Sequence, residues 1–421
     1  PALDGEIGAI SMRAVWLDPR PIAGLLRVHR ARDFGEMREM FSSWPGLPLN
    51  IVAGFATGDI AWQLVGEAPQ RKKGWGTVPL AGWDPETGWA EDTISVEALP
   101  HALNPETGFL ATANNRPTTD GKGPYVGVDF IDGYRLARIV EVLGARDDWD
   151  LDAVGELQMD RTPIPWQEIR EVVLEAPVLN DTVRRAQEML REWEGVASPD
   201  SVATTVYEFF IVEMAHRIVA AKAPNSTEWA LGRGFTDLSP ESIVFARWTG
   251  QLVRLLNERP SGWFAQGWER EIADALEATY RALSQRYGDD ESGWAWGVVR
   301  PLTFKHPVGE RKPMDRVFNL GPFPWGGDAN TVSQAAVSFR DPAANSHFVA
   351  SMRMAVEVGN WDANRFVLPG GQSGNPMSPH YDDQLERYRT GRAITIAWSA
   401  DAVETATRET LELRPESPSD P

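Results

Sequence analysis

The sequence has 421 residues, of which 42% are hydrophobic and 24% charged, so it can bury a large core. A net charge of −19 argues against nucleic acid and anionic membrane surfaces as partners, and no apolar run is long enough to cross a bilayer. The chain has no cysteine, which excludes disulfides, thiolate metal sites and a cysteine nucleophile.

The first predicted elements lie before residue 107. The sequence predicts a strand over Met12–Asp18 and then a helix over Pro21–Met40, where apolar residues recur near a 3.6-residue period. Asn50–Gly66 has the clearest hairpin pattern, because two apolar runs flank Thr57-Gly58-Asp59 and glycine there permits a positive φ. Residues 67–106 are rich in Gly and Pro and predict loops.

Polar side chains gather in Thr107–Arg135, TGFLATANNRPTTDGKGPYVGVDFIDGYR. A strand-like run, Phe109–Thr112, precedes two amides, Asn114 and Asn115, and Arg135 follows in the first turn of a predicted helix. An amide and a guanidinium on the ends of rigid elements suit the stabilisation of a developing oxyanion. Taken alone, however, Asn-Asn-Arg-Pro is more simply interpreted as an ordinary turn.

The middle of the chain is predicted to be mainly helical. A first helix is expected over Asp132–Gly144, with Asp132 as its N-cap. Further helices, several with Asp or Ser near their starts, are predicted over Trp166–Ala176, Asp181–Glu194, Pro199–Ala221, Pro240–Arg259 and Trp268–Tyr287.

The chain then returns to β-branched or alternating patterns. These predict strands over Trp294–Phe304, Ser346–Val358, Asn364–Leu368, Ala393–Trp398 and Glu404–Leu413. Strands before and after a helical block, without regular β-α alternation, favour an α+β fold over a doubly wound parallel sheet.

Two glycine-rich loops carry further polar residues. Pro369–Asp383 holds a local Ser-His-Asp set, made of Ser373, Ser378, His380, Asp382 and Asp383. Triads are assembled from distant segments, so a loop that bonds its own backbone is the simpler interpretation, and the same holds for Asn319–Val332. No nucleotide-binding glycine loop, G-x-S-x-G elbow or H-E-x-x-H motif is present.

Metal ligands are not indicated strongly. The six histidines have no pair at metal-ligand spacing, so a zinc site is not expected. Three carboxylates near the polar stretch could bind calcium, although no spaced ligand loop is visible: Asp120, Asp129 and Asp132.

Seven stretches between Asn50 and Gln384 resemble, in the same order, the penicillin acylase (penicillin amidase) family of N-terminal nucleophile hydrolases. They are NIVAGFATGDIAWQLVGEAPQR, NPETGFLATANNRP, GVDFIDGYRLARI, LQMDRTPIPWQEI, TFKHPVG, FNLGPFPWGGDANTV and LPGGQSGNPMSPHYDDQ. The resemblance implies a four-layer αββα sandwich. It also implies a precursor that cuts itself into an α chain and a β chain, whose new N-terminal Ser attacks the acyl carbonyl with its own α-amino group as the base.

The resemblance assigns roles to few residues of this chain. Asn114 matches the asparagine whose amide donates to the oxyanion, and Arg135 matches the arginine that supports it. Ala113 stands where some members carry a bulky residue, which implies a differently shaped acyl pocket. No cofactor is needed for the chemistry, and a structural calcium ion stays open because its ligands do not carry over clearly.

From this resemblance the sequence is interpreted as the C-terminal portion of a penicillin-acylase-like β chain. Pro1 lacks a hydroxyl, so the nucleophile is expected outside this chain, and the chain alone is expected to be inactive. Residues 1–421 are expected to form one domain, with a strand-rich part (1–165), a helical insertion (166–290) and a strand-rich return (291–421). The expected partners are an α chain, the N-terminal part of the β chain and a small acylated amide, without nucleic acid or membrane.

Three functions remain open at this point. The first is hydrolysis of linear amides by acyl transfer to the N-terminal Ser. The second is an N-acyl-homoserine lactone or lipopeptide acylase of the same family. The third is a non-catalytic interaction protein that retains the scaffold. A periplasmic or secreted location is implied by the family alone.

Overall fold

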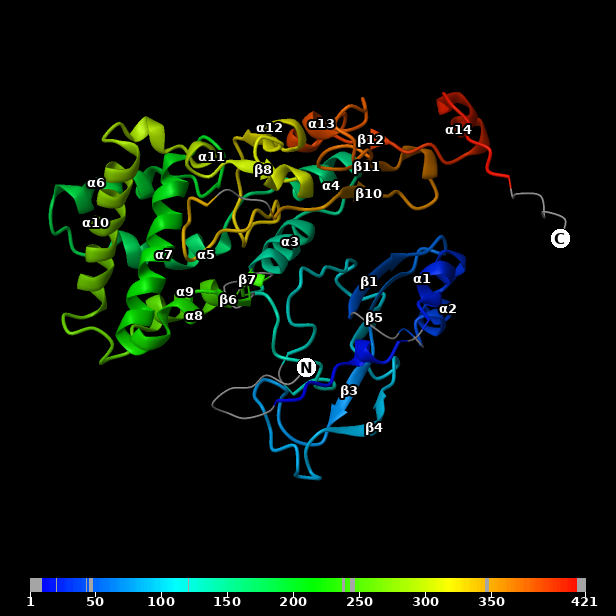
Figure 1. Cartoon of the computed structure of the whole chain (residues 1–421), viewed down its shortest axis with the longest axis horizontal. Coiled ribbons are helices and arrows are strands. Elements are labelled where there is room, and N and C mark those ends of the chain that lie inside the picture. Colours follow the sequence, from blue (N-terminus) through cyan, green and yellow to red (C-terminus); the bar gives the residue numbers. More distant parts are fainter. Residues whose placement is uncertain are drawn as a thin grey trace. The chain divides into compact units, whose positions relative to one another are not determined.

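A computed structural model describes residues 10–19, 21–42, 44, 48–119, 121–236, 239–242, 247–344 and 348–414 (Figure 1). It divides into two compact units: residues 1–147 with 160–349, and residues 148–159 with 350–421. Within the described ranges, no helix is both long and apolar enough to cross a membrane.

The first unit begins with short helices rather than with a strand. The strand predicted over Met12–Asp18 is wrong: Val15–Leu17 form one 3-10 turn, and Trp16 and Leu17 are exposed, so the apolar alternation does not mark a buried face. The helix predicted over Pro21–Met40 forms in three pieces, which are α1 (Ala23–Arg27), η2 (Val28–Arg30) and α2 (Phe34–Met40).

The predicted hairpin is confirmed. Strands β1 (Leu49–Gly54) and β2 (Ile60–Val65) pair antiparallel, and β5 (His101–Leu103) pairs with the other edge of β2. Gly58 has φ 94° in the turn, a conformation that favours glycine. Helix α2 packs on this sheet through a small core of Met37, Phe41, Trp44, Phe55, Ala61 and Val65.

The stretch predicted as loops contains a second small sheet, of β3 (Ala68–Arg71) and β4 (Trp89–Ile94). After it, the strand expected over Phe109–Thr112 does not form. The expected helix does, as α3 (Tyr134–Gly144), but its N-cap is Gly133 and not Asp132.

Asp132 instead caps a helix that lies more than a hundred residues later in the sequence. Its Oδ2 accepts a hydrogen bond from the backbone N of Gly250, 2.7 Å away, in the first turn of α9 (Trp248–Glu258). Arg247, just before α9, also reaches back to Asp129 at 2.8 Å. The loop that leads into α3 is therefore fastened to the start of α9.

The helices predicted between Trp166 and Tyr287 form, but the predicted start of the helix over Pro240–Arg259 is wrong, because Pro240 and Glu241 belong to a strand and the helix begins at Trp248. The helices of this block are α5 (Ile164–Leu174), α6 (Asp181–Glu192), α7 (Val202–Lys222), α8 (Thr227–Ala230), α9 and α10 (Trp268–Tyr287). Figure 1 shows α7 and α10 side by side, with α6 against α10. Helix α7 is buried over most of its length, so it forms the centre of the larger core.

The remainder of the first unit alternates short helices and strands. Most of the strand predicted over Trp294–Phe304 is wrong, because the segment forms a 3-10 turn and α11 (Trp296–Val299) before β8 (Leu302–Phe304). Trp294 and Trp296 are fully buried, so they anchor this turn in the core instead of lining a sheet face. The other elements of this unit are β6 (Arg233–Thr236), β7 (Ser239–Glu241), α12 (Asp315–Phe318) and β9 (Leu320–Phe323).

The second unit joins segments that are far apart in the sequence. Helix α4 (Leu151–Gln158), which the sequence analysis missed, packs against β10 (Arg353–Ala355) of a three-stranded sheet (Figure 1). The sheet continues with β11 (Arg365–Val367), as predicted over Asn364–Leu368, and β12 (Ile394–Thr395). Of the strand predicted over Ser346–Val358, β10 forms, and residues 345–347 lie outside the described part.

The last predicted strand is wrong. Residues Glu404–Leu413 begin inside α14 (Ala400–Ala406) and then have no regular structure. The Ser399 hydroxyl accepts from the backbone N of Ala402, so a cap overrides the alternating threonines. Helix α13 (Leu385–Arg389) completes this unit.

Candidate active site

The polar stretch of the sequence folds into a tight turn at Asn114. Asn114 has φ 60°, in the left-handed region that asparagine tolerates better than most residues. The turn is held from both sides: the Ala113 N–H donates to Asn115 Oδ1 at 2.9 Å, and the Ile131 N–H donates to the Asn114 carbonyl at 3.0 Å. Asn115 thus bonds within the turn, whereas the Asn114 side chain is exposed.

Arg135 fixes the orientation of the Asn114 amide. From the first turn of α3, its Nη2 donates to the Ala113 carbonyl at 2.8 Å and to Asn114 Oδ1 at 2.9 Å. A guanidinium has no acceptor, so the oxygen of the amide must face Arg135 and the nitrogen must face away. Asn114 Nδ2 forms no hydrogen bond with the residues that the structure describes, and it remains a free donor.

Both residues line a cavity of about 400 Å³. The cavity is lined by Pro48, Leu49, Asn50, Thr112, Ala113, Asn114, Arg135, Ile139 and Val332. Burial lowers the pKa of Arg135 from its ordinary value. The guanidinium is still charged at neutral pH, because arginine does not lose its proton in proteins. Of these lining residues only Arg135 titrates, so none of them can act as a general base toward the Thr112 hydroxyl.

The Ser-His-Asp set of the Pro369–Asp383 loop does not form a triad. His380 Nδ1 lies 2.8 Å from Asp383 Oδ2, but the Ser378 hydroxyl accepts from the His380 backbone N and the Ser373 hydroxyl accepts from that of Asn375. Neither serine donates to the imidazole in the hydrogen bonds of this described loop. The simpler interpretation, a loop that bonds its own backbone, fits this geometry.

The other glycine-rich loop leads to a buried charged cluster that the sequence analysis missed. Asp328 is 1% exposed and accepts from the backbone N of Asn330 at 2.7 Å and of Thr331 at 2.8 Å. Burial and the nearby Asp328 charge raise the pKa of Glu208 well above its ordinary range, while burial lowers that of Arg300 to about 10. The sequence signal for this cluster was Glu208, a glutamate within the otherwise apolar run of α7.

Two of the three carboxylates considered for calcium already have protein partners. Asp129 pairs with Arg247 and Asp132 accepts from the Gly250 amide, and Asp120 lies outside the described residues. Across the described ranges, no three His, Asp or Glu side chains come together in a way that could hold a metal ion. An arginine facing Asp129 does not fit a cation site at this loop, and a structural calcium ion stays a prediction.

Comparison with known proteins places this chain in a family. A family model described as "Penicillin amidase" matches residues 1–405. The chain belongs to the penicillin amidase family. Among solved structures, a thermostable penicillin G acylase from Alcaligenes faecalis matches with a TM-score of 0.64 at 20% identity, over 94% of this chain and 72% of that chain. Together with the family match, this likeness confirms the predicted α+β class and the fold shared with penicillin G acylase.

Two kinds of acylase are among the curated relatives. The penicillin acylase 2 proenzyme of Pseudomonas sp. (strain SE83) is 28% identical over 420 residues, covering 97% of this chain and 52% of that protein. The acyl-homoserine lactone acylase QuiP of Pseudomonas aeruginosa is 25% identical over 416 residues, covering 90% of this chain and 47% of that protein. The chain therefore spans about half the length of the curated relatives it matches.

Proposed function

We propose that this chain supplies the oxyanion-binding side of the active site of an amidohydrolase that cleaves linear amides by acyl transfer. Asn114 donates from Nδ2 to the oxyanion of the tetrahedral intermediate, and Arg135 holds the amide in that orientation. The observation that carries the proposal is the pair of hydrogen bonds from Arg135 Nη2, which turn the Asn114 nitrogen away from the arginine.

The electrostatics of this pair suit an oxyanion. The positive charge of Arg135 polarises the amide through Oδ1, so Nδ2 becomes a stronger donor, and the charge itself favours a nearby anion. The turn is fixed before any substrate arrives, because Asn115 and Ile131 hold its backbone. A donor held in advance needs no reorganisation during the reaction, which is the condition for effective oxyanion stabilisation.

The nucleophile is proposed to come from outside this sequence. The cavity beside Asn114 offers the Thr112 hydroxyl but no general base among its lining residues, so that hydroxyl is not activated there. The family resemblance supplies the rest of the proposal: an α chain, and the N-terminal part of a β chain that begins with a Ser whose α-amino group is the base. A periplasmic or secreted location belongs to the same proposal.

The identity of the acyl group is proposed from the cavity and from the relatives. Ala113 presents only a methyl group next to Asn114 and lines the cavity, which leaves room for an acyl chain. The relatives include acylases named for penicillin and for acyl-homoserine lactones, and these names favour two substrate classes that share a linear amide. N-acyl-homoserine lactones or lipopeptides are therefore the second candidate substrates.

The test is turnover by the protein produced together with the reading frame upstream of this sequence. Chromogenic phenylacetyl and fatty-acyl amides report the two substrate classes in parallel. Hydrolysis that is lost in the Asn114→Asp variant supports the proposal. If neither amide is hydrolysed by the longer protein, the scaffold serves as a non-catalytic interaction protein instead.

A further inference from the structure

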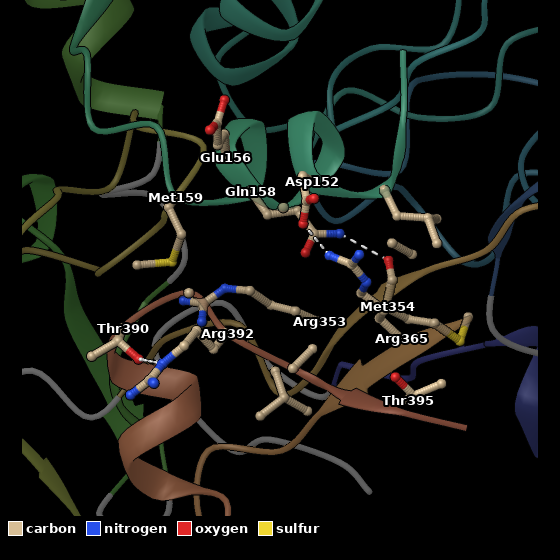
Figure 2. A pocket seen from close by; sticks show the side chains of 16 residues that line it. Asp152, Glu156, Gln158, Met159, Arg353, Met354, Arg365, Thr390, Arg392 and Thr395 are labelled. Atoms are coloured by element: carbon tan, nitrogen blue, oxygen red, sulfur yellow. Dashed lines mark hydrogen bonds and ion pairs between the residues drawn. The ribbon is translucent and has the colours of Figure 1, made fainter. Parts of the chain in front are cut away.

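The second unit contains a larger cavity with a different chemistry. Its volume is about 720 Å³, within the range of small-molecule sites, and it lies where α4 meets strands β10, β11 and β12 (Figure 2). None of its lining residues also lines the cavity at Asn114. The two cavities can therefore be tested separately.

Arg353 is a buried cation with no anionic partner among the described residues. Arg353 is only 7% exposed. Its Nη1 donates a hydrogen bond to the Tyr388 carbonyl, 2.7 Å away. The guanidinium stacks over the Tyr388 ring, 4.0 Å from its centroid. Burial lowers its pKa, which is the response of a cation that is desolvated without a counter-charge.

A second arginine lies beside it. Arg392 donates from Nε to the Thr390 hydroxyl at 3.1 Å and has no ion pair with any residue in the described part of the chain. Figure 2 shows the guanidinium groups of Arg353 and Arg392 on the same side of the cavity, near Met159 and Thr390. Two unneutralised cations at one place repel each other, so an anion between them lowers the energy of both.

The third arginine of the cavity provides an internal contrast. Arg365 is already neutralised, since its Nη1 forms an ion pair with Asp152 of α4 (Figure 2). The only other acid in the lining is the exposed Glu156, so three arginines face two carboxylates. This excess of positive charge stands out in a chain whose net charge is −19.

Part of the remaining lining is apolar. Side chains without charge or hydrogen-bonding groups come from Leu151, Met159, Ala355, Val367 and Ala393. Methionine adapts its shape readily and is common where a surface must accept an apolar body. The cavity thus combines a pair of arginines with several apolar side chains, which complements a small molecule with one anionic end and a short hydrocarbon body.

We propose that this cavity binds a small organic carboxylate with a short hydrocarbon body, whose oxygens lie between Arg353 and Arg392. A carboxylate matches the planar fork of a guanidinium better than a spherical anion does. The Tyr388 carbonyl and the Thr390 hydroxyl hold the two arginines in place for it. The site is independent of amide hydrolysis at Asn114.

Calorimetric titration of the 421-residue chain with acetate, butanoate and hexanoate tests the site. Hexanoate is expected to bind saturably, and affinity is expected to rise about threefold to fourfold per added methylene. Arg353→Gln and Arg392→Gln should each weaken hexanoate binding about tenfold or more. The control Arg387→Gln removes an exposed arginine of α13 that does not line the cavity, and it should leave binding unchanged.

Several results would overturn the proposal. One is the absence of saturable hexanoate binding up to about 10 mM, where a site tighter than about 1 mM would be filled. Another is equal binding by wild type and both cavity variants. Binding of a short acidic peptide in place of hexanoate would assign the cavity to a protein segment and also refute it. Arg392 is exposed, so Arg392→Gln keeps the test valid if Arg353→Gln fails to fold.

Discussion

Replacing Asn114 by Asp in the proposed intact enzyme removes one hydrogen-bond donor and adds one negative charge, while the shape of the side chain is kept. The aspartate keeps the shape of the amide and tolerates the left-handed backbone at φ 60°. Its carboxylate still accepts from Arg135, which now lies 2.9 Å from Oδ1 of the amide. The N–H that faces the cavity is lost, and an oxygen takes its place.

The expected loss follows from the oxyanion role. Removing one donor of this kind typically lowers kcat by about 10²–10³, or about 2.7–4 kcal/mol of transition-state stabilisation. A carboxylate beside the oxyanion adds repulsion, so Asn114→Asp should reach at least that loss. Asn114→Gly also removes the donor but adds no charge, so its loss of kcat is expected to fall within that range. Stability should change little in both, whereas alanine at a positive φ would cost about 1–2 kcal/mol.

Steady-state hydrolysis of a chromogenic acyl amide measures the effect, with thermal unfolding as the check on folding. Asn104→Gly is the matched control, because Asn104 also has a positive φ, 45°, but does not line the cavity. Its variant should retain kcat. Turnover by Asn114→Asp within about threefold of wild type, in a folded protein, would refute the reasoning, because a transition-state donor contributes far more.

The remaining predictions concern residues around the site and in the core. Arg135→Met should lower kcat about tenfold to a hundredfold, and combining it with Asn114→Gly should add little, since both disrupt one unit; additive losses in the double variant would contradict this. Asp132→Ala should lower the unfolding free energy by about 0.5–2 kcal/mol, because the cap of α9 is lost. Asp129→Ala, which removes an exposed ion pair, should lower it by less than about 1 kcal/mol. Denaturant titration measures both, and a larger loss in Asp129→Ala would count against the cap. Burial raises the pKa of Glu208 well above its ordinary value, so the folded form keeps a proton that the unfolded chain releases, and stability should fall as pH rises above the ordinary carboxyl range toward the raised pKa. Glu208→Gln should flatten this fall, and an unchanged slope would show that another group causes it.

Patterns that depend on neighbouring residues were predicted best. The hairpin around Gly58 formed because its turn and its two apolar runs agree, and the predicted bounds Trp268–Tyr287 match those of α10. The strand expected over Glu404–Leu413 failed because alternation in an exposed segment brings no buried face, while the Ser399 cap starts a helix. Local propensity is a weak guide where no packing supports it.

Features formed by segments far apart in the sequence could not be predicted. Asp132 is of a residue type that favours N-caps, but the helix it caps begins more than a hundred residues later. Arg353 lies in β10 and Arg392 lies just before β12, and only folding brings them to one cavity. Asn114 and Arg135 could be singled out because the family resemblance joined them, whereas the orientation of the amide required their hydrogen bonds.

The central claim is that this chain holds the oxyanion side of an amidohydrolase site whose nucleophile lies outside it. The most direct measurement compares hydrolysis of a chromogenic acyl amide by the 421-residue chain and by the same chain produced with its upstream reading frame. The account predicts turnover by the longer protein and none by the chain alone. Equal turnover by both proteins would contradict it, because the catalytic groups would then all lie within this sequence.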